Sequence, residues 1–254
     1  MSTTEVLKKV KGSMCSVEGT KYEQVVHGVL SKCLPFGSTM MFNTQHKSEL
    51  GGSNHRSDIT CNWRYLLDTP IEIKKMNTPD WMQCSLIYDD ISEQWIGSSK
   101  NKIPYNSKLI FEALLTHNKL FQDKIPPFFF KNMTHDEWKH VKKAHPEFSD
   151  MYFDCPDNTI QRLYREKGCR YIQVSEKGLY HLGDDSCGFD VPKFVCPQEI
   201  RIRIKVHERC NKKGFCVLSV IAACKPKQIT AVVESPISLD SPDRLPANFT
   251  FLND

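Results

Sequence analysis

Residues 57–76 contain two segments of strand-like sequence that carry charged residues at positions able to meet. Asp58 opens the first segment, and Glu72, Ile73 and Lys74 lie in the second, after a turn. Because residues two apart on a strand project to the same face, Glu72 and Lys74 share one face and Ile73 lies on the other. A hairpin would place the Asp58 and Glu72 carboxylates side by side, with the Lys74 ammonium adjoining. Paired carboxylates repel each other and favour a cation, so the sequence predicts a site for a hard divalent ion with oxygen ligands.

These residues resemble the active-site motif of the PD-(D/E)XK nuclease superfamily, whose members share the restriction-endonuclease-like fold. Asp58 matches the first acid of the motif, Glu72 the second acid and Lys74 the lysine, while Ser57 stands where the family name has proline. The resemblance implies that Asp58, Glu72 and the Ile73 carbonyl hold Mg²⁺ or Mn²⁺. It also implies a metal-dependent endonuclease that hydrolyses DNA phosphodiester bonds, in which Lys74 positions or helps to deprotonate the attacking water.

Other interpretations of the same residues stay open. An acid and a lysine on a hairpin are also typical of a solvated sheet face with cross-strand ion pairs. The apolar neighbours Ile59, Trp63 and Ile71 favour a sheet covered on both faces, where an acid pair without a role would be costly. Two functional alternatives are a catalytically inactive nucleic-acid-binding module on the same fold and an RNA endonuclease.

The spacing of apolar residues predicts the order helix, strand, strand, strand, helix over the first part of the chain. With the resemblance, this order implies an α/β protein with a mixed central sheet flanked by helices, a restriction-endonuclease-like core. A helix is expected over residues 19–33, opened by a capping box from Thr20 to Glu23, and another helix begins after Asn77. Further helices are expected at 106–121, after a capping box at Thr134, and at 157–167 before Gly168. Strands are expected at 39–43, around Asp58 and Glu72, and at 171–175, 178–182, 199–207 and 215–224.

These elements predict four regions along the chain. Residues 1–91 form the N-terminal part of the nuclease core, and residues 92–168 a helical insertion. Residues 169–234 supply the remaining core strand and a β-rich C-terminal part, and residues 235–254 an extended tail.

Two further residues join the catalytic set that the resemblance implies. Glu23 would supply an additional acid from the first helix, although a capping box accounts for it equally well. Gln83, in the helix expected after the Glu72 strand, would contact the substrate; otherwise it belongs to a polar helix face.

Two groups of polar and basic residues suit contacts with nucleic-acid phosphates. One is the loop before Asp58, with Lys47, Ser53, His55 and Arg56. The other is the expected strand 199–207, where apolar residues alternate with Arg201, Arg203 and Lys205. A row of cations can follow a phosphate backbone. The alternatives are an ordinary hydrophilic loop and an edge strand protected from aggregation by its charge.

The 254-residue chain has a formal net charge of +4, which permits an anionic partner such as DNA. It has no run of roughly 18 or more apolar residues, and its N-terminus lacks the apolar core of a signal peptide. We therefore expect an intracellular protein, nuclear or cytoplasmic rather than secreted, without a membrane partner. The resemblance allows a homodimer, because one active site of this kind cuts one strand.

The 11 cysteines form no Cys-x-x-Cys pair, and we expect them to be reduced thiols. A zinc site is the alternative, with ligands drawn from Cys187, Cys196, His207, Cys210 and Cys216. Their spacing fits no standard zinc knuckle.

Overall fold

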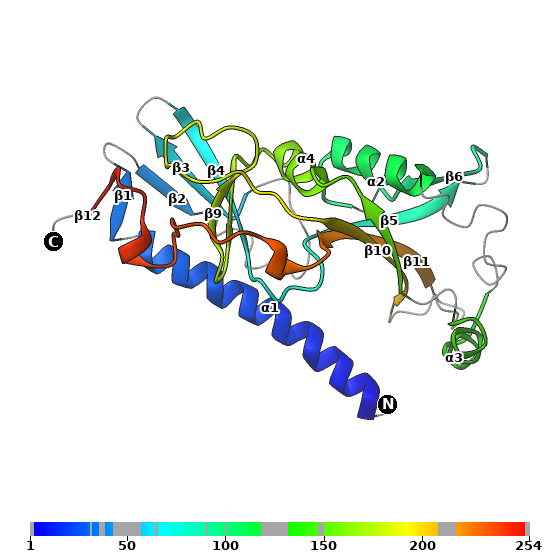
Figure 1. Ribbon diagram of the computed structural model, residues 1–254. Coiled ribbons are helices and arrows are strands. Elements are labelled where there is room, and N and C mark those ends of the chain that lie inside the picture. Colours follow the sequence, from blue (N-terminus) through cyan, green and yellow to red (C-terminus); the bar gives the residue numbers. More distant parts are fainter. Residues whose placement is uncertain are drawn as a thin grey trace. The chain divides into compact units, whose positions relative to one another are not determined.

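The computed structural model describes residues 3–30, 32–35, 39–42, 57–63, 66–89, 91–99, 101–117, 132–146, 150–207 and 217–251. These residues form a mixed α/β protein with two five-stranded sheets and a two-stranded pair (Figure 1). The chain divides into two compact units, each assembled from separate segments. Unit 1 comprises Met1–Pro79, Gln161–Pro197 and Gln228–Asp254, and unit 2 comprises Asp80–Ile160 and Gln198–Lys227. Within the described ranges, no helix is both long enough and apolar enough to cross a membrane.

Unit 1 is built on a mixed sheet. Its elements are α1 (Thr3–Leu30), β1 (Cys33–Pro35), β2 (Thr39–Phe42), β3 (Ile59–Trp63), β4 (Leu66–Lys74), most of α4 (Thr159–Glu166), β8 (Tyr171–Val174), β9 (Gly178–His181), the short 3-10 helices η4 (Ile229–Ala231) and η5 (Pro242–Arg244), and β12 (Phe249–Phe251). The sheet order is β2-β3-β4-β8-β9. The central pair β4–β8 is parallel and its neighbours are antiparallel, while β1 pairs with β12.

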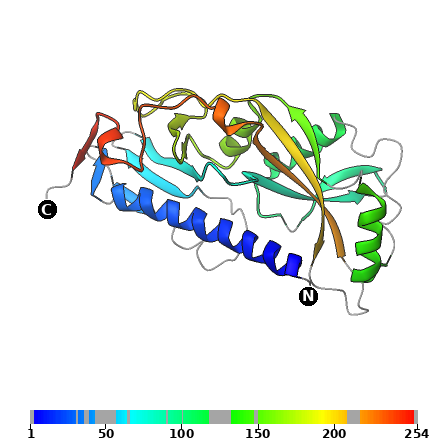
Figure 2. The same ribbon diagram turned by 60° about the horizontal axis from the view of Figure 1, so that its bottom comes forward.

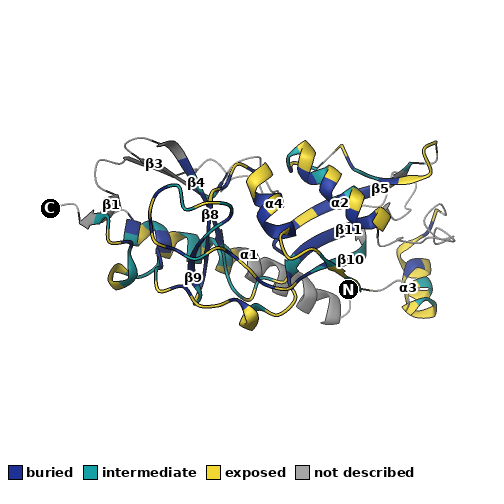
Figure 3. Ribbon diagram, turned by 45° about the horizontal axis from the view of Figure 1, so that its top comes forward, coloured by how far each residue is buried: buried dark blue, intermediate teal, exposed yellow. Residues whose placement is uncertain are grey.

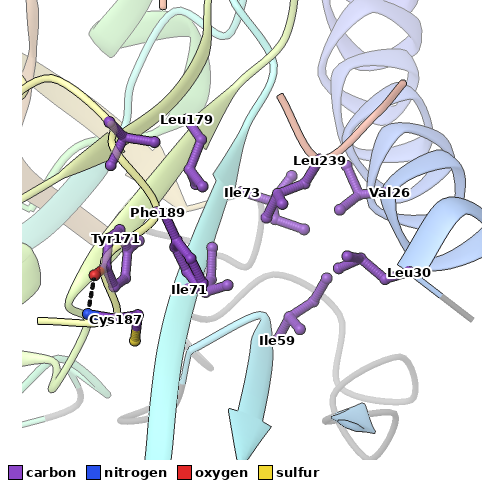
Figure 4. Close-up of a cluster of buried hydrophobic side chains, with 11 residues drawn as sticks. Val26, Leu30, Ile59, Ile71, Ile73, Tyr171, Leu179, Cys187, Phe189 and Leu239 are labelled. Atoms are coloured by element: carbon purple, nitrogen blue, oxygen red, sulfur yellow. Dashed lines mark hydrogen bonds between the residues drawn. The ribbon is translucent and has the colours of Figure 1, made fainter. Parts of the chain in front are cut away.

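One face of this sheet packs against α1. Ile71 and Ile73 of β4 are buried together with Val26 and Leu30 of α1 and with Leu239 from the C-terminal segment (Figure 4). Burial of such aliphatic side chains supplies about 1.5–3 kcal/mol each. The alternation of β4 therefore turns Ile71 and Ile73 toward α1 and sends Glu72 and Lys74 to the opposite face.

At that opposite face, a side chain of α4 lies beside β4. The Tyr164 ring of α4 lies with its centroid 5.4 Å from Lys74 Nζ. Helices thus flank both faces of a mixed sheet, as the sequence predicted. The fourth core strand expected at residues 171–175 is also confirmed, as β8.

Unit 2 contains an antiparallel sheet. Its elements are β5 (Met82–Asp89), β6 (Gln94–Gly97), α2 (Tyr105–His117), α3 (His135–Ala144), β7 (Met151–Cys155), β10 (Gln198–His207) and β11 (Val217–Pro226). The sheet order is β6-β5-β11-β10-β7. Strands β10 and β11 pair over their full length (Figure 2), and β11 is largely buried (Figure 3). The expected capping box at the start of α3 is present, with Thr134 and Glu137 bonding reciprocally.

The first helix is longer than predicted. It begins at Thr3 instead of residue 19, so Thr20 and Glu23 lie inside α1 and form no N-terminal cap. The Thr-x-x-Glu spacing of a capping box also occurs within continuous helices, and no proline interrupts residues 3–30.

The helix predicted after Asn77 is a strand. In β5 the buried Met82, Cys84 and Leu86 alternate with the exposed Gln83 and Ile87. This is the two-residue period of a strand, and β5 pairs antiparallel with β11.

The regional boundaries also differ from the prediction. Residues 92–168 are no purely helical insertion, because β6 and β7 join a sheet completed by the distant β10 and β11. The segment predicted as an extended tail belongs to unit 1, where Ser235 and Leu239 are buried. The backbone of this segment bonds to the β8–β9 hairpin, through Leu179 N–H to the Ile237 carbonyl at 2.8 Å and Ser235 N–H to the Lys177 carbonyl at 2.8 Å.

Candidate active site

Asp58, Glu72 and Lys74 come together at the antiparallel pair β3–β4. Asp58 lies one residue before β3, and its Oδ2 accepts a hydrogen bond from the Ile73 N–H at 2.8 Å. Lys74 Nζ lies 2.5 Å from Glu72 Oε1 and 3.9 Å from Asp58 Oδ2. The three side chains of the predicted motif therefore share one small region of unit 1.

A second lysine completes this charge cluster. Lys167 Nζ lies 2.6 Å from Glu72 Oε2, so each oxygen of the Glu72 carboxylate faces one ammonium group. The Cys169 thiol donates a longer contact of 3.7 Å to the same Oε2. We call Asp58, Glu72, Lys74 and Lys167 the acid–lysine cluster.

The C-terminal end of α4 places Lys167 and Cys169 beside Glu72. Cys169 N–H bonds to the Tyr164 carbonyl and Gly168 N–H to the Arg165 carbonyl, both at 2.9 Å. This is a Schellman motif, which needs a left-handed residue after the cap, and Gly168 supplies it with φ +88°. The glycine was expected to close this helix, but Lys167 itself was not identified from the sequence. It lies 95 positions from Glu72 and outside the motif.

An aromatic ring lies close to both ammonium groups. The centroid of the buried Tyr164 ring is 5.4 Å from Lys74 Nζ and 5.9 Å from Lys167 Nζ. Cations at this distance interact favourably with the electron-rich face of an aromatic ring. Burial is the main cause that raises the pKa of the Tyr164 hydroxyl, and the Glu72 charge adds to it. Tyr164 therefore stays neutral beside the cluster.

The acid–lysine cluster is largely withdrawn from solvent. The side chains of Glu72 and Lys167 are 2% and 6% exposed, whereas those of Lys74 and Asp58 are 16% and 23% exposed. Solvent, and hence a ligand, reaches the cluster on the side of Asp58 and Lys74.

The two carboxyl groups respond to burial in opposite ways. Burial raises the pKa of Asp58, and the neighbouring Glu72 charge raises it further. Burial alone would also raise the pKa of Glu72, but the ammonium groups of Lys167 and Lys74 outweigh it and lower that pKa. Glu72 is therefore the firmly ionised acid, and Asp58 is the acid that lacks a full counter-charge.

Both lysines are held in their charged form. Burial would lower the pKa of Lys74, but the Glu72 and Asp58 carboxylates raise it instead, and Glu23 of α1 adds to the effect. The same two carboxylates raise the pKa of Lys167. Glu23 thus belongs to the electrostatic surroundings of Lys74, from a position inside α1.

The oxygen atoms at this site fit a hard divalent cation. Along β4 the Pro70 and Lys74 carbonyls accept hydrogen bonds from Arg170 and Ser175, on the β8 side. Because backbone groups alternate between the two edges of a strand, the Ile73 carbonyl points to the other edge, where Asp58 lies. Asp58, Glu72 and this carbonyl would supply the ligands. Among the described residues, no three His, Cys, Asp or Glu side chains form a metal-binding group.

The other predicted site residues lie elsewhere. Gln83 is exposed on β5 of unit 2 and accepts a hydrogen bond from Arg203 at 2.9 Å. Lys47, Ser53, His55 and Arg56 lie outside the described residues. The side chain of Lys205 is likewise outside them.

Arg201 and Arg203 of β10 already have acidic partners within unit 2. Arg203 Nη2 lies 2.8 Å from Asp80 Oδ2, and Arg201 Nη1 lies 3.4 Å from Asp80 Oδ1. Arg201 Nη2 also pairs with Asp150 at 2.7 Å. These pairs offset part of the positive charge on which the expected phosphate contact depends, and the contact stays a prediction.

The zinc alternative gains no support from the residues that can be located. Cys187 and Cys196 are buried in unit 1, and Cys187 Sγ contacts Thr69 Oγ1 at 3.3 Å. His207 ends β10 in unit 2, and Cys210 and Cys216 lie outside the described residues.

Comparison with known proteins gives little beyond this geometry. No protein-family model matches the chain, and no curated protein matches it. Among solved structures, the chain is similar to HhaI endonuclease in complex with DNA, with 17% sequence identity and a TM-score of 0.40. The match covers 76% of this chain and 64% of that one. At this TM-score the likeness by itself assigns neither a fold family nor an activity.

Proposed function

We propose that the chain is a metal-dependent endonuclease that hydrolyses DNA phosphodiester bonds at the acid–lysine cluster. One observation carries the proposal: the Lys74 ammonium lies 2.5 Å from Glu72 and 3.9 Å from Asp58, on the outward side of a largely buried acid pair. This juxtaposition is what the PD-(D/E)XK resemblance requires of its three motif residues, and it arises on a mixed sheet flanked by helices.

The acids would hold Mg²⁺ or Mn²⁺ together with the Ile73 carbonyl. When bound, the metal stabilises charge on the phosphate and acidifies a water molecule. Asp58 is oriented for this role in advance, because the Ile73 N–H fixes its Oδ2. Burial is the main cause of its raised pKa, and the neighbouring Glu72 charge adds to it. A cation bound between the two acids would offset that repulsion.

Lys74 would act on the substrate as a cation and hydrogen-bond donor. The surrounding carboxylates raise its pKa, so it keeps its proton at neutral pH and is no base while it pairs with Glu72. From its partly exposed position it can orient the attacking water and stabilise a phosphate oxygen. Water then adds to phosphorus as the P–O3′ bond breaks, which leaves a 5′-phosphate and a 3′-hydroxyl.

Plasmid cleavage tests this proposal. With supercoiled DNA and Mg²⁺, the unmodified chain should nick or linearise the plasmid, and Lys74→Met and Asp58→Ala should abolish cleavage without abolishing DNA binding. Lys75→Met is the matched control, because the Lys75 ammonium pairs with Glu18 of α1, on the other side of the sheet. Loss of cleavage in the control as well, or cleavage that survives Lys74→Met, would contradict the assignment. A single-stranded RNA of matched sequence distinguishes ribonuclease activity.

The second candidate is a nucleic-acid-binding module without catalysis. It is favoured by the full pairing of Glu72, whose two oxygens both contact lysine ammonium groups. Such a module would retain DNA binding in a mobility-shift measurement and would cleave no DNA with Mg²⁺ or Mn²⁺.

A further inference from the structure

Lys167 occupies the position on Glu72 that a divalent cation would need. Its ammonium lies 2.6 Å from Oε2, while Lys74 takes Oε1 at 2.5 Å. A metal ion that binds Glu72 must approach one of these oxygens to a similar distance. A divalent ion and an ammonium group on the same oxygen would repel each other strongly in this buried setting. One lysine must therefore leave before Glu72 can act as a ligand.

We propose that Lys167 is an exchangeable internal counter-ion: it neutralises Glu72 without metal and is displaced when a divalent cation binds. This inference rests on the proposed metal site. It identifies Lys167, not Lys74, as the lysine that leaves, because Lys74 also lies within 3.9 Å of Asp58 and shares the outward side with it. Lys167 is 6% exposed, and the carboxylates Glu72 and Asp58 are what hold its charge in place.

The charge balance of the cluster supports the exchange. Without metal, two carboxylates face two ammonium groups, and the formal charges cancel. A divalent cation added to this set would leave an excess of two positive charges, whereas a cation that replaces the Lys167 ammonium leaves a smaller excess. The Schellman end of α4 holds the Lys167 backbone, so the exchange requires movement of the side chain alone, along its four-carbon stem.

In this exchange Lys167 competes with the metal for the Glu72 carboxylate. The alternative is that Lys167 holds Glu72 in position for the metal. If Lys167 competes, removal of its charge with little change in side-chain length should strengthen metal binding. A residue that merely holds Glu72 in position would have the reverse effect, because its loss would weaken metal binding. The sign of the change in affinity separates the two roles.

Calorimetric titration with Mn²⁺, and with the non-catalytic ion Ca²⁺, provides the measurement. Lys167→Met should bind Mn²⁺ roughly tenfold or more tightly than the unmodified chain. Lys167→Arg, which keeps the charge, should bind no more tightly, and the control Lys75→Met should be unchanged. Equal or weaker binding by Lys167→Met would overturn the proposal. Absence of Mn²⁺ binding to both the unmodified chain and Lys167→Met would overturn it as well.

Melting temperatures with and without Mn²⁺ test the proposal even if Lys167→Met is poorly folded without metal. Removal of one partner from a buried ion pair is strongly destabilising, so Lys167→Met should melt at a lower temperature without metal. Mn²⁺ should raise its melting temperature more than that of the unmodified chain, since the cation takes the place of the lost ammonium. If Lys167→Met and Lys167→Gln stay unfolded at every Mn²⁺ concentration, a metal cannot replace this lysine and the proposal fails. Tighter Mn²⁺ binding without DNA cleavage would sustain the exchange and reject the nuclease.

Discussion

The two units each bury a carboxylate between two cations, yet the arrangements suit different purposes. In unit 1 the Glu72 side chain is 2% exposed and each of its oxygens faces a lysine. In unit 2 the Asp80 side chain is 3% exposed and each of its oxygens faces an arginine. The lysines are compact charges on flexible stems, whereas the guanidinium groups of Arg201 and Arg203 are planar and fix several hydrogen bonds at once. The first cluster is suited to exchange of its cations and the second to permanent attachment.

The second acid of each cluster sharpens this difference. Asp58 lies against Glu72, and burial together with the Glu72 charge raises its pKa. Asp150 is 46% exposed and pairs with the outer nitrogen of Arg201. Two acids that repel each other attract an additional cation, and two acids separated by an arginine have no such need. A buried ion network is therefore a candidate cation site where two of its acids lie against each other, even though its formal charges cancel.

The largest expected effect is on catalysis. Glu72→Gln should lower Mg²⁺-dependent DNA cleavage at least about a thousandfold, because it removes a metal ligand and its charge. Asp80→Asn, the corresponding change in unit 2, should keep cleavage of the same order as the unmodified chain. Initial rates of plasmid nicking, at a temperature where circular dichroism shows both variants folded, make the comparison. Equal losses of cleavage in both variants would contradict the assignment of catalysis to the acid–lysine cluster alone.

The cluster around Asp80 should matter for stability rather than for cleavage. Asp80→Ala leaves Arg201 and Arg203 without their buried partner and should lower the free energy of unfolding by about 3 kcal/mol, the low end for a broken buried pair, because both arginines are partly exposed. Urea unfolding measures the loss. Added Mn²⁺ should not restore the stability that Asp80→Ala loses, whereas it should restore the stability that Lys167→Met loses. Restoration of both by Mn²⁺ would mean that the metal acts away from the acid–lysine cluster.

The pH dependence of stability should have opposite signs for the two acids of unit 1. Because the folded-state pKa of Glu72 is lowered, its contribution is present above the unfolded pKa of about 4.3 and is lost as the pH falls through the folded value. Because the folded-state pKa of Asp58 is raised, its contribution is present at low pH and is lost as the pH rises. In metal-free buffer at pH 7, Asp58→Asn should therefore stabilise the chain and Glu72→Gln should destabilise it. Unfolding midpoints from pH 3 to pH 7 test both signs, and a stabilising Glu72→Gln would refute the assignment.

The smallest expected effect concerns the end of α4. Gly168 has φ +88° with nothing within 4 Å of an added Cβ, and Gly188 has φ +63° with equally open space. Gly168→Ala and Gly188→Ala should each cost about 1 kcal/mol of stability from backbone strain alone. Only Gly168→Ala should also change Mn²⁺ affinity, because Gly168 shapes the turn that carries Lys167. Calorimetric titration of both variants with Mn²⁺ measures the two affinities. An equal change in both would contradict the inference that the Gly168 turn positions Lys167 at the metal site.

Local patterns predicted that Asp58, Glu72 and Lys74 lie together in the candidate site, but they could not predict the whole acid–lysine cluster. Asp58, Glu72 and Lys74 lie on adjacent strands of one hairpin, and strand alternation alone determines which face each side chain takes. Lys167 reaches Glu72 through tertiary packing, 95 positions along the chain. The periodicity of neighbouring residues cannot predict such a contact. The same limit applies to unit 2, where β5 and β7 pair with strands far along the chain.

The incorrect prediction of a helix after Asn77, where the structure has β5, has a different cause. The alternation of buried Met82, Cys84 and Leu86 is present in the sequence, but the preceding Asn77-Thr78-Pro79-Asp80 is also typical of a helix start. The capping box expected at Thr20 failed for a related reason. A start signal only marks where a helix can begin, and packing decides whether one does.

The parallel pairing of β4 with β8 has a consequence for how the protein is made. The β3–β4 hairpin leaves the ribosome before β8 and Lys167, which follow only after the whole first segment of unit 2. Closure of so long a loop is slow and costs entropy. The nascent hairpin therefore carries two carboxylates against one ammonium until translation reaches α4. Lys167, the last residue of the acid–lysine cluster to be made, then supplies the second ammonium group beside Glu72.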